Sequence, residues 1–156
     1  MYETAPIRRL HRTLLIHRIV QIMLTVLLLY MALHFQQLFL AKGTPHIFRN
    51  SLLATLLLQF ALFFPLRRFA GNEARRELAA AVQAPIDQQK QLRQQRLIGD
   101  TLKGAVFLGF AAFILMAPPA TFVLSTAFFC FIVTVITYLQ CFNFAVKRGL
   151  AGQTTA

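Results

Sequence analysis

Three long stretches of this chain, residues 19–41, 51–66 and 104–146, carry no charged side chain. An α-helix needs about 20 predominantly apolar residues to cross the hydrocarbon core of a bilayer. The composition fits that environment, because 57% of the residues are hydrophobic and only 13% are charged, well below the charged share of a soluble domain. The chain is therefore expected to be a polytopic membrane protein of the all-α class.

The apolar stretches predict a membrane helix bundle with four transmembrane helices, arranged as two helical hairpins. The first hairpin covers 19–66, with a tight turn at 41–46 that contains glycine and proline. As one helix, 104–146 would measure about 64 Å, twice the bilayer core, so it must fold back. Pro118 and Pro119 supply the break, because proline lacks the N–H group that a helix interior uses. A re-entrant or kinked segment around Pro118 is the alternative.

The hydrophilic stretch 67–103 predicts a helical loop between the hairpins. Asn72 is expected to cap a helix over 73–82, which ends at Ala84-Pro85. Pro85 then opens a second, glutamine-rich helix that can run without a break into the third span. The loop is either a solvated helical hairpin or a docking surface for a partner, whose contact residues would be Lys90, Arg93 and Arg96.

The basic residues lie almost entirely on one side of the apolar spans. The segment 1–18, the loop 67–103 and the tail 147–156 hold all but two of the 16 Lys and Arg, and those two are Lys42 and Arg49. Cytoplasmic flanks of membrane helices are enriched in Lys and Arg. This bias predicts a multi-pass protein of the cell inner (plasma) membrane, with both termini and the loop in the cytoplasm.

The net charge of +11 flanks apolar spans and does not form a soluble basic face. We therefore expect anionic lipid head groups as partners, and no nucleic acid. The segment 1–18 is either a basic amphipathic helix that starts near Pro6 and lies on the membrane surface, or a plain charged flank. A cleavable signal peptide is not expected, because the first span is too long for one. The membrane-surface residues are Arg8, Arg9, Arg12, Arg18, Arg67 and Arg68.

The sequence contains no recognisable catalytic motif or metal-ligand spacing, so we predict no catalytic or metal site. The five acidic residues all lie outside the deep parts of the spans, whereas pumps and ion paths carry such residues at membrane depth. Cys130 and Cys141 lie on one helix, about 16 Å apart, which is too far for a disulfide between them.

His34 is the candidate for a cofactor contact. A b-type haem between membrane helices usually takes two axial histidines that face each other across the ring. His11 and His17 point to different faces of one helix, so they cannot share a haem. His34 and His46 are both expected on the outer side of the membrane, but at different depths, which is a poor geometry for a shared haem. We therefore expect no cofactor, with haem b as the alternative, and we expect His34 to form a hydrogen bond within the helix bundle.

Polar groups inside the spans are expected to satisfy one another between helices, within this chain or with another subunit. They are His34, Gln36, Gln37, Gln59, Thr134, Thr137, Gln140 and Asn143. Small residues of the third span predict a face for close helix approach, formed by Gly104, Gly109, Ala111 and Ala112.

The sequence thus has polar and small residues suited to helix packing, but no reactive site. This combination favours a non-catalytic integral membrane subunit, which is not an enzyme in itself. It would scaffold, assemble or stabilise a larger inner-membrane complex, with other membrane subunits as its partners. One alternative is a haem- or quinone-binding membrane anchor of a respiratory complex that uses His34. Another is a homo-oligomeric small pore or lipid-handling protein.

Reporter fusions test the predicted four-span topology. A cytoplasm-active reporter at Ala156 is expected to be active, as are periplasm-active reporters at Thr44 and Pro118, because the basic flanks stay inside. Activity at Thr44 with inactivity at Pro118 would show a re-entrant third segment instead.

Overall fold

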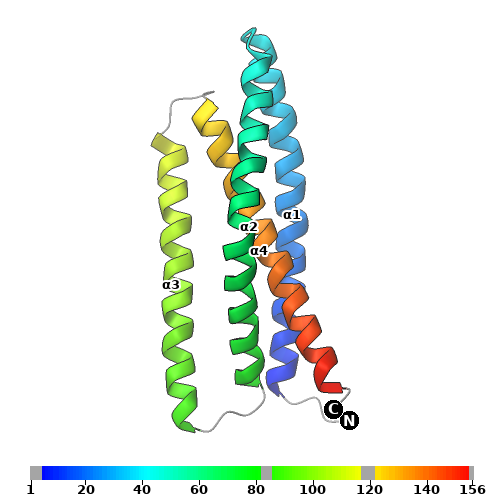
Figure 1. Ribbon diagram of the computed structural model, residues 1–156, viewed down its shortest axis with the longest axis vertical. Helices are drawn as coiled ribbons and strands as arrows, with labels where there is room; N and C mark the ends of the chain where they lie inside the picture. Colours follow the sequence, from blue (N-terminus) through cyan, green and yellow to red (C-terminus); the bar gives the residue numbers. More distant parts are fainter. Residues whose placement is uncertain (1–4, 82–85, 117–121, 155–156) are drawn as a thin grey trace.

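The computed structural model describes residues 5–81, 86–116 and 122–154. They form four α-helices, α1 (Ala5–Ala41), α2 (Pro45–Ala81), α3 (Ile86–Met116) and α4 (Phe122–Thr154), and no strand occurs within these ranges. Figure 1 shows the helices running alternately up and down the long axis, with the start of α1 and the end of α4 at the same end. The predicted all-α bundle is therefore confirmed.

Three of the helices are long and apolar enough to cross a membrane. The stretches that qualify are His11–Ala41, Pro45–Ala79 and Phe122–Ala151. The apolar part of α3 within the described residues is shorter, Gly104–Phe113, or about 15 Å of helix. The crossing by α3 stays a prediction, and the predicted break at Pro118-Pro119 lies outside the described residues.

Backbone hydrogen bonds at the end of α1 fix the turn into α2. The N–H of Thr44 donates to the carbonyl of Phe39 (2.9 Å), and the N–H of Gly43 donates to that of Leu40 (3.0 Å). This pair of bonds is the pattern of a Schellman C-cap. Gly43 has a φ of 67°, which a residue without Cβ adopts freely. Pro45 follows as the first residue of α2, a position where proline is favoured. The predicted tight turn is confirmed.

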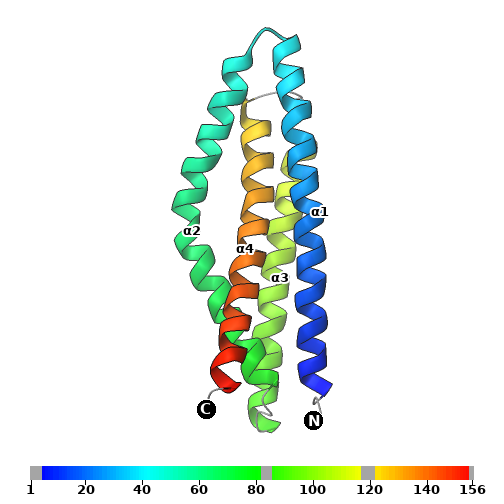
Figure 2. The same cartoon turned by 90° about the vertical axis from the view of Figure 1, so that its right-hand side faces the viewer.

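Helix α2 continues through Pro65 and ends only at Ala81. The helix therefore does not end where the first hairpin was expected to end, at residue 66, and the membrane boundary at that position stays a prediction. The helix cap predicted at Asn72 is wrong, because Asn72 lies inside α2. An interior proline removes one helical hydrogen bond and bends the helix, and Figure 2 shows α2 bowed in its middle. The 37 residues of α2 measure about 55 Å, so the helix extends well beyond a bilayer core of about 30 Å.

The other helices also run past their apolar stretches. Helix α1 is unbroken from Ala5 onward, so the described part of 1–18 is no separate surface helix and agrees with the alternative of a charged flank. Helix α3 carries the glutamine-rich segment into the third span without a break, as expected. Helix α4 continues past Val146 to Thr154. The break predicted at Ala84-Pro85 lies outside the described residues.

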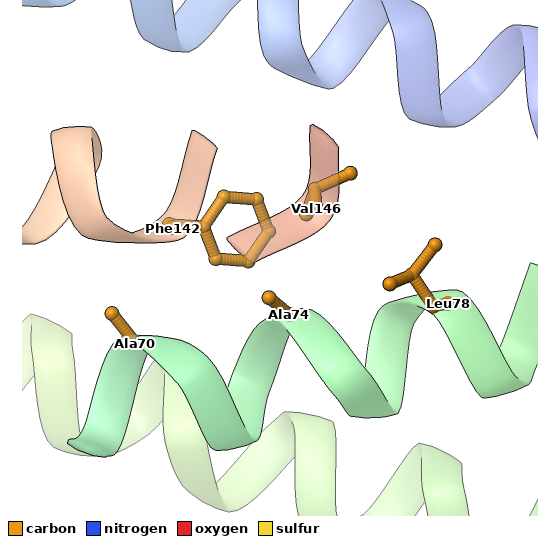
Figure 3. Close-up of a cluster of buried hydrophobic side chains, with 5 residues drawn as sticks. All are labelled: Ala70, Ala74, Leu78, Phe142 and Val146. Atoms are coloured by element: carbon orange, nitrogen blue, oxygen red, sulfur yellow. The ribbon is translucent and has the colours of Figure 1, made fainter. Parts of the chain in front are cut away.

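The most extensive contact among the described residues joins α2 and α4, and within the same residues α3 is packed least against the other helices. In the half of the bundle that contains the end of α2, this contact buries Ala70, Ala74 and Leu78 of α2 against Phe142 and Val146 of α4. Figure 3 shows Ala70 and Ala74 pointing toward α4 beside Phe142, with Leu78 close to Val146. Small residues four positions apart let two helices approach closely. The first half of the predicted loop is therefore part of the bundle.

A second buried cluster lies near the α1–α2 turn and is aromatic. Phe35 and Phe39 of α1 pack with Phe129 of α4. The rings of Phe35 and Phe129 meet edge to face, with their centroids 5.6 Å apart. The rings of Phe48 and Phe129 do the same, with centroids 6.2 Å apart. This is a favoured geometry for aromatic pairs. This cluster ties α1 to both α2 and α4.

Replacing Ala74 by Leu tests the α2–α4 contact. Because Ala74 is 0% exposed, the larger side chain must push the helices apart, and the free energy of unfolding should fall by about 1–3 kcal/mol. Ala79→Leu, at an exposed position of the same helix, is the matched control. The measurement is denaturant unfolding of both variants in detergent, and equal stability would show that α2 and α4 are not packed as described.

Candidate functional site

The amide of Gln59 joins α2 to α4 within the stretches that are apolar enough to cross a membrane. Its Nε2 donates to Oγ1 of Thr137 (2.9 Å), and its Oε1 accepts from Oγ1 of Thr134 (3.1 Å). Both ends of the amide are thus satisfied by hydroxyl groups one helical turn apart. An amide that is left without hydrogen-bond partners in hydrocarbon would destabilise the protein by several kcal/mol. The prediction that polar groups pair between helices is confirmed for these three residues.

Hydroxyl residues extend this contact toward the α1–α2 turn. Ser51 and Ser125 are both 0% exposed, and Oγ1 of Thr55 donates to the carbonyl of Ser51 (2.8 Å) and to that of Thr126 (3.5 Å). Small hydroxyl residues can bond within their own helix and still allow a close approach. Sequence reasoning missed Ser125 and Thr126. The feature of the sequence that indicates this contact is the four-residue spacing of the polar residues at positions 51, 55 and 59, which places them on one side of α2.

A third contact joins the same helices in the part of α2 that follows Pro65. The hydroxyl of Tyr138 on α4 donates to Oε2 of Glu73 on α2. Assigning 67–103 to a loop separated Glu73 from the bundle, so this bond was not predicted. A bond to a charged acceptor is stronger than one between neutral groups, and it holds α2 to α4 beyond Pro65.

His34 lies on an exposed face of α1. Its ring stacks on that of Tyr30, with centroids 6.4 Å apart and planes within 7°. The expectation that His34 bonds within the bundle is therefore wrong, because its side chain faces outward. Gln36 and Gln37 are also exposed, so they too lie outside the polar contacts of the bundle. The cause is the rotation of α1 about its axis, which buries Phe35 and Phe39 instead.

The histidines do not form a metal-binding cluster with other residues in the described parts of the chain, where no group of three or more His, Cys, Asp or Glu comes together. His17 is half-buried and meets the ring of Phe142 edge-on at 5.0 Å, while His11 and His46 are exposed. Haem b stays an alternative that requires a ligand besides His34. Cys130 and Cys141 are both free thiols.

Exposed arginines lie in the half of the bundle that contains the start of α1 and the end of α4, which we call the basic end. The described ones among the predicted membrane-surface residues are Arg12, Arg18, Arg67 and Arg68. Arg8 and Arg9 belong to α1 as well, but their side chains lie outside the described set. The predicted docking residues all lie in the first half of α3, and their side chains too lie outside that set: Lys90, Arg93 and Arg96.

An apolar groove of about 640 Å³ lies between α2, α3 and α4. It is lined by residues that include Leu58, Gly109, Phe110 and Cys130. A Cβ atom added at Gly104 or Gly109 would meet nothing within 4 Å. These glycines therefore make no close helix contact within the described residues, and their approach to another subunit stays a prediction.

Comparison of the chain with protein-family models, curated proteins and solved structures gave no match. The residues and their geometry are thus the basis for any functional assignment. The structure places buried polar groups between α2 and α4. Exposed polar groups lie on α1, and exposed basic groups lie at the basic end.

A double-mutant cycle tests the Gln59 contact. Gln59→Leu removes both interhelical bonds and should lower the free energy of unfolding in detergent by about 1–2 kcal/mol. Adding Thr137→Val to that variant should cost less than the same change in the native chain, because the partner is already lost. Thr25→Val is the control, since Thr25 is exposed and bonds only to the carbonyl of Gln21 in its own helix. Strict additivity would argue against the contact.

Proposed function

We propose that this protein is a non-catalytic integral membrane subunit that scaffolds, assembles or stabilises a larger inner-membrane complex. The observation that carries this proposal is the contrast between the tightly joined pair α2–α4 and the lightly attached helix α3. Buried hydrogen bonds give the pair a fixed geometry, as a structural support needs. Helix α3 leaves much of its apolar surface available to another membrane protein.

The contacts of α3 support this view. Phe110 stacks on Phe131 of α4 at 4.8 Å, and Phe107 lies 5.6 Å from the same ring. Farther along α3, Leu115 and Met116 are each 85% exposed. Helix association in a bilayer depends on packing and interhelical hydrogen bonds, not on the hydrophobic effect between helices. An incompletely packed helix is therefore a natural place for a partner helix to add contacts.

The basic end of the bundle supplies the second element of the proposal. In the proposed orientation this end faces the cytoplasm, following the bias of Lys and Arg. Exposed arginines of α1 and α2 would contact anionic head groups, each contributing about 1 kcal/mol near the surface. Lys90, Arg93 and Arg96, on the stretch of α3 that precedes its apolar part, would orient a cytoplasmic partner surface.

A haem- or quinone-binding anchor is the second candidate, and the exposed imidazole of His34 favours it. A partner helix could bring a second axial ligand to this outward face. Purification in mild detergent separates the two functions. A Soret band at stoichiometric haem, lost in His34→Leu with a normal protein yield, would establish the anchor and displace the scaffold proposal.

Charge reversal at the α3 residues tests the scaffold proposal. The triple variant Lys90→Glu, Arg93→Glu and Arg96→Glu should insert normally and retain its stability, but recover its partner chains in reduced yield after affinity purification. Lys147→Glu with Arg148→Glu, two exposed changes at the end of α4, is the control for a general effect of charge. Topology reporters must show correct insertion of both variants. Full partner recovery by the triple variant would show that this part of α3 is a solvated connection.

A further inference from the structure

An apolar groove lies between α3 and the closely packed pair α2–α4. Its volume is about 640 Å³, and all three helices contribute to its walls. Figure 1 shows α3 standing apart from α2. Every lining residue falls within one of the apolar stretches, which are Pro45–Ala79 on α2, Gly104–Phe113 on α3 and Phe122–Ala151 on α4. In a chain inserted into a bilayer through these stretches, the groove is surrounded by lipid acyl chains.

The surface of the groove presents almost no polar atom to an occupant. None of its described lining residues is charged, and Thr126 carries the one hydroxyl among them. The Oγ1 atom of Thr126 is itself buried, and the whole residue is only 9% exposed. Sites for cofactors and other small molecules place a few polar groups so that they orient the ligand. The wall of this groove offers no such group, so it suits a hydrocarbon chain and not the polar head of a cofactor.

The size of the groove favours a single chain over a transmembrane helix. A helix with its side chains is about 10 Å across, so the part of it that lay along Phe122 to Cys130, about 12 Å, would occupy about 1,000 Å³. The groove holds about 640 Å³. Water is not a stable occupant either, because an apolar cavity stays dry. An acyl chain of the surrounding lipid is thin and flexible enough to enter.

We propose that the groove binds one acyl chain of a membrane phospholipid, and that this chain packs α3 against α2 and α4. The rings of Phe107 and Phe110 pack on Phe131 of α4. Phe110 also lines the groove, so the groove lies directly beside this aromatic contact. An unfilled gap loses the dispersion contacts of the atoms around it. The bound chain supplies these contacts, and lipid thereby becomes part of the packing of α3.

Fluorescence quenching tests the proposal, because the chain contains no tryptophan. Phe113→Trp places a single fluorophore on the wall of the groove. Leu115→Trp is the matched control, since Leu115 is 85% exposed and lies outside the groove. Phospholipid with brominated acyl chains is titrated into each full-length variant in mild detergent. Half-maximal quenching at Phe113→Trp should need about tenfold less lipid, as a site about 1.4 kcal/mol more favourable than the micelle requires. Equal lipid dependence at the two positions would overturn the proposal.

A second substitution tests whether the bound chain occupies the groove. A Cβ atom added at Gly109 or Gly104 would meet nothing within 4 Å, so leucine fits at both positions, but only Gly109 lines the groove. Added to Phe113→Trp, Gly109→Leu should remove the high-affinity quenching, and Gly104→Leu should preserve it. High-affinity quenching that survived Gly109→Leu would show that the lipid binds elsewhere.

Two further outcomes would assign the groove to a different occupant. An isoprenoid quinone that displaced the brominated lipid more effectively than unlabelled phospholipid would identify the quinone as the ligand. Loss of a co-purified membrane chain in Gly109→Leu, but not in Gly104→Leu, without high-affinity quenching in Phe113→Trp, would identify a partner helix. The inference goes beyond the scaffold function and does not rest on it, because that function is measured separately, by partner recovery after charge reversal on α3.

Discussion

The hydrogen bonds of Gln59 with Thr134 and Thr137 lie at the centre of the contact on which the bundle is built. Between helices in a bilayer the hydrophobic effect gives little net attraction, because lipid chains are as apolar as leucine. Shape and internal hydrogen bonds must hold the helices together instead. Helices α2 and α4 meet both needs, with small or hydroxyl residues toward the α1–α2 turn, the amide in the middle and alanines beyond Pro65.

Much of the fold could be predicted from local features of the sequence. Charge-free stretches of bilayer length identified the membrane helices, and Gly43 with Pro45 identified the turn. The prediction failed where local signals competed with packing. Pro65 and Asn72 resemble a helix end and a helix start, but proline is tolerated in membrane helices, and Ala70 and Ala74 bury their side chains against α4 only if α2 continues.

The outward orientation of His34 shows a different limit. A helix that is apolar on nearly every side carries little information about which side faces its neighbours. The sequence identified the polar residues inside the spans, yet it did not determine the rotation of each helix or the register between them. Gln59 and His34 therefore looked alike as candidates for a bond inside the bundle, and only the structure separates the half-buried, bonded amide from the exposed imidazole.

The limited apolar length of α3 would have a consequence for the surrounding lipid in a chain whose third helix crosses the bilayer. From Gly104 to its end at Met116, α3 is uncharged over about 20 Å, while the neighbouring helices present apolar surfaces suited to a bilayer core of about 30 Å. Such a mismatch is relieved by local thinning of the bilayer, by side chains that reach toward the head groups, or by association with another protein. A crossing α3 would therefore thin the bilayer on its own side of the molecule, and a neighbouring protein that took the place of this lipid would relieve the mismatch.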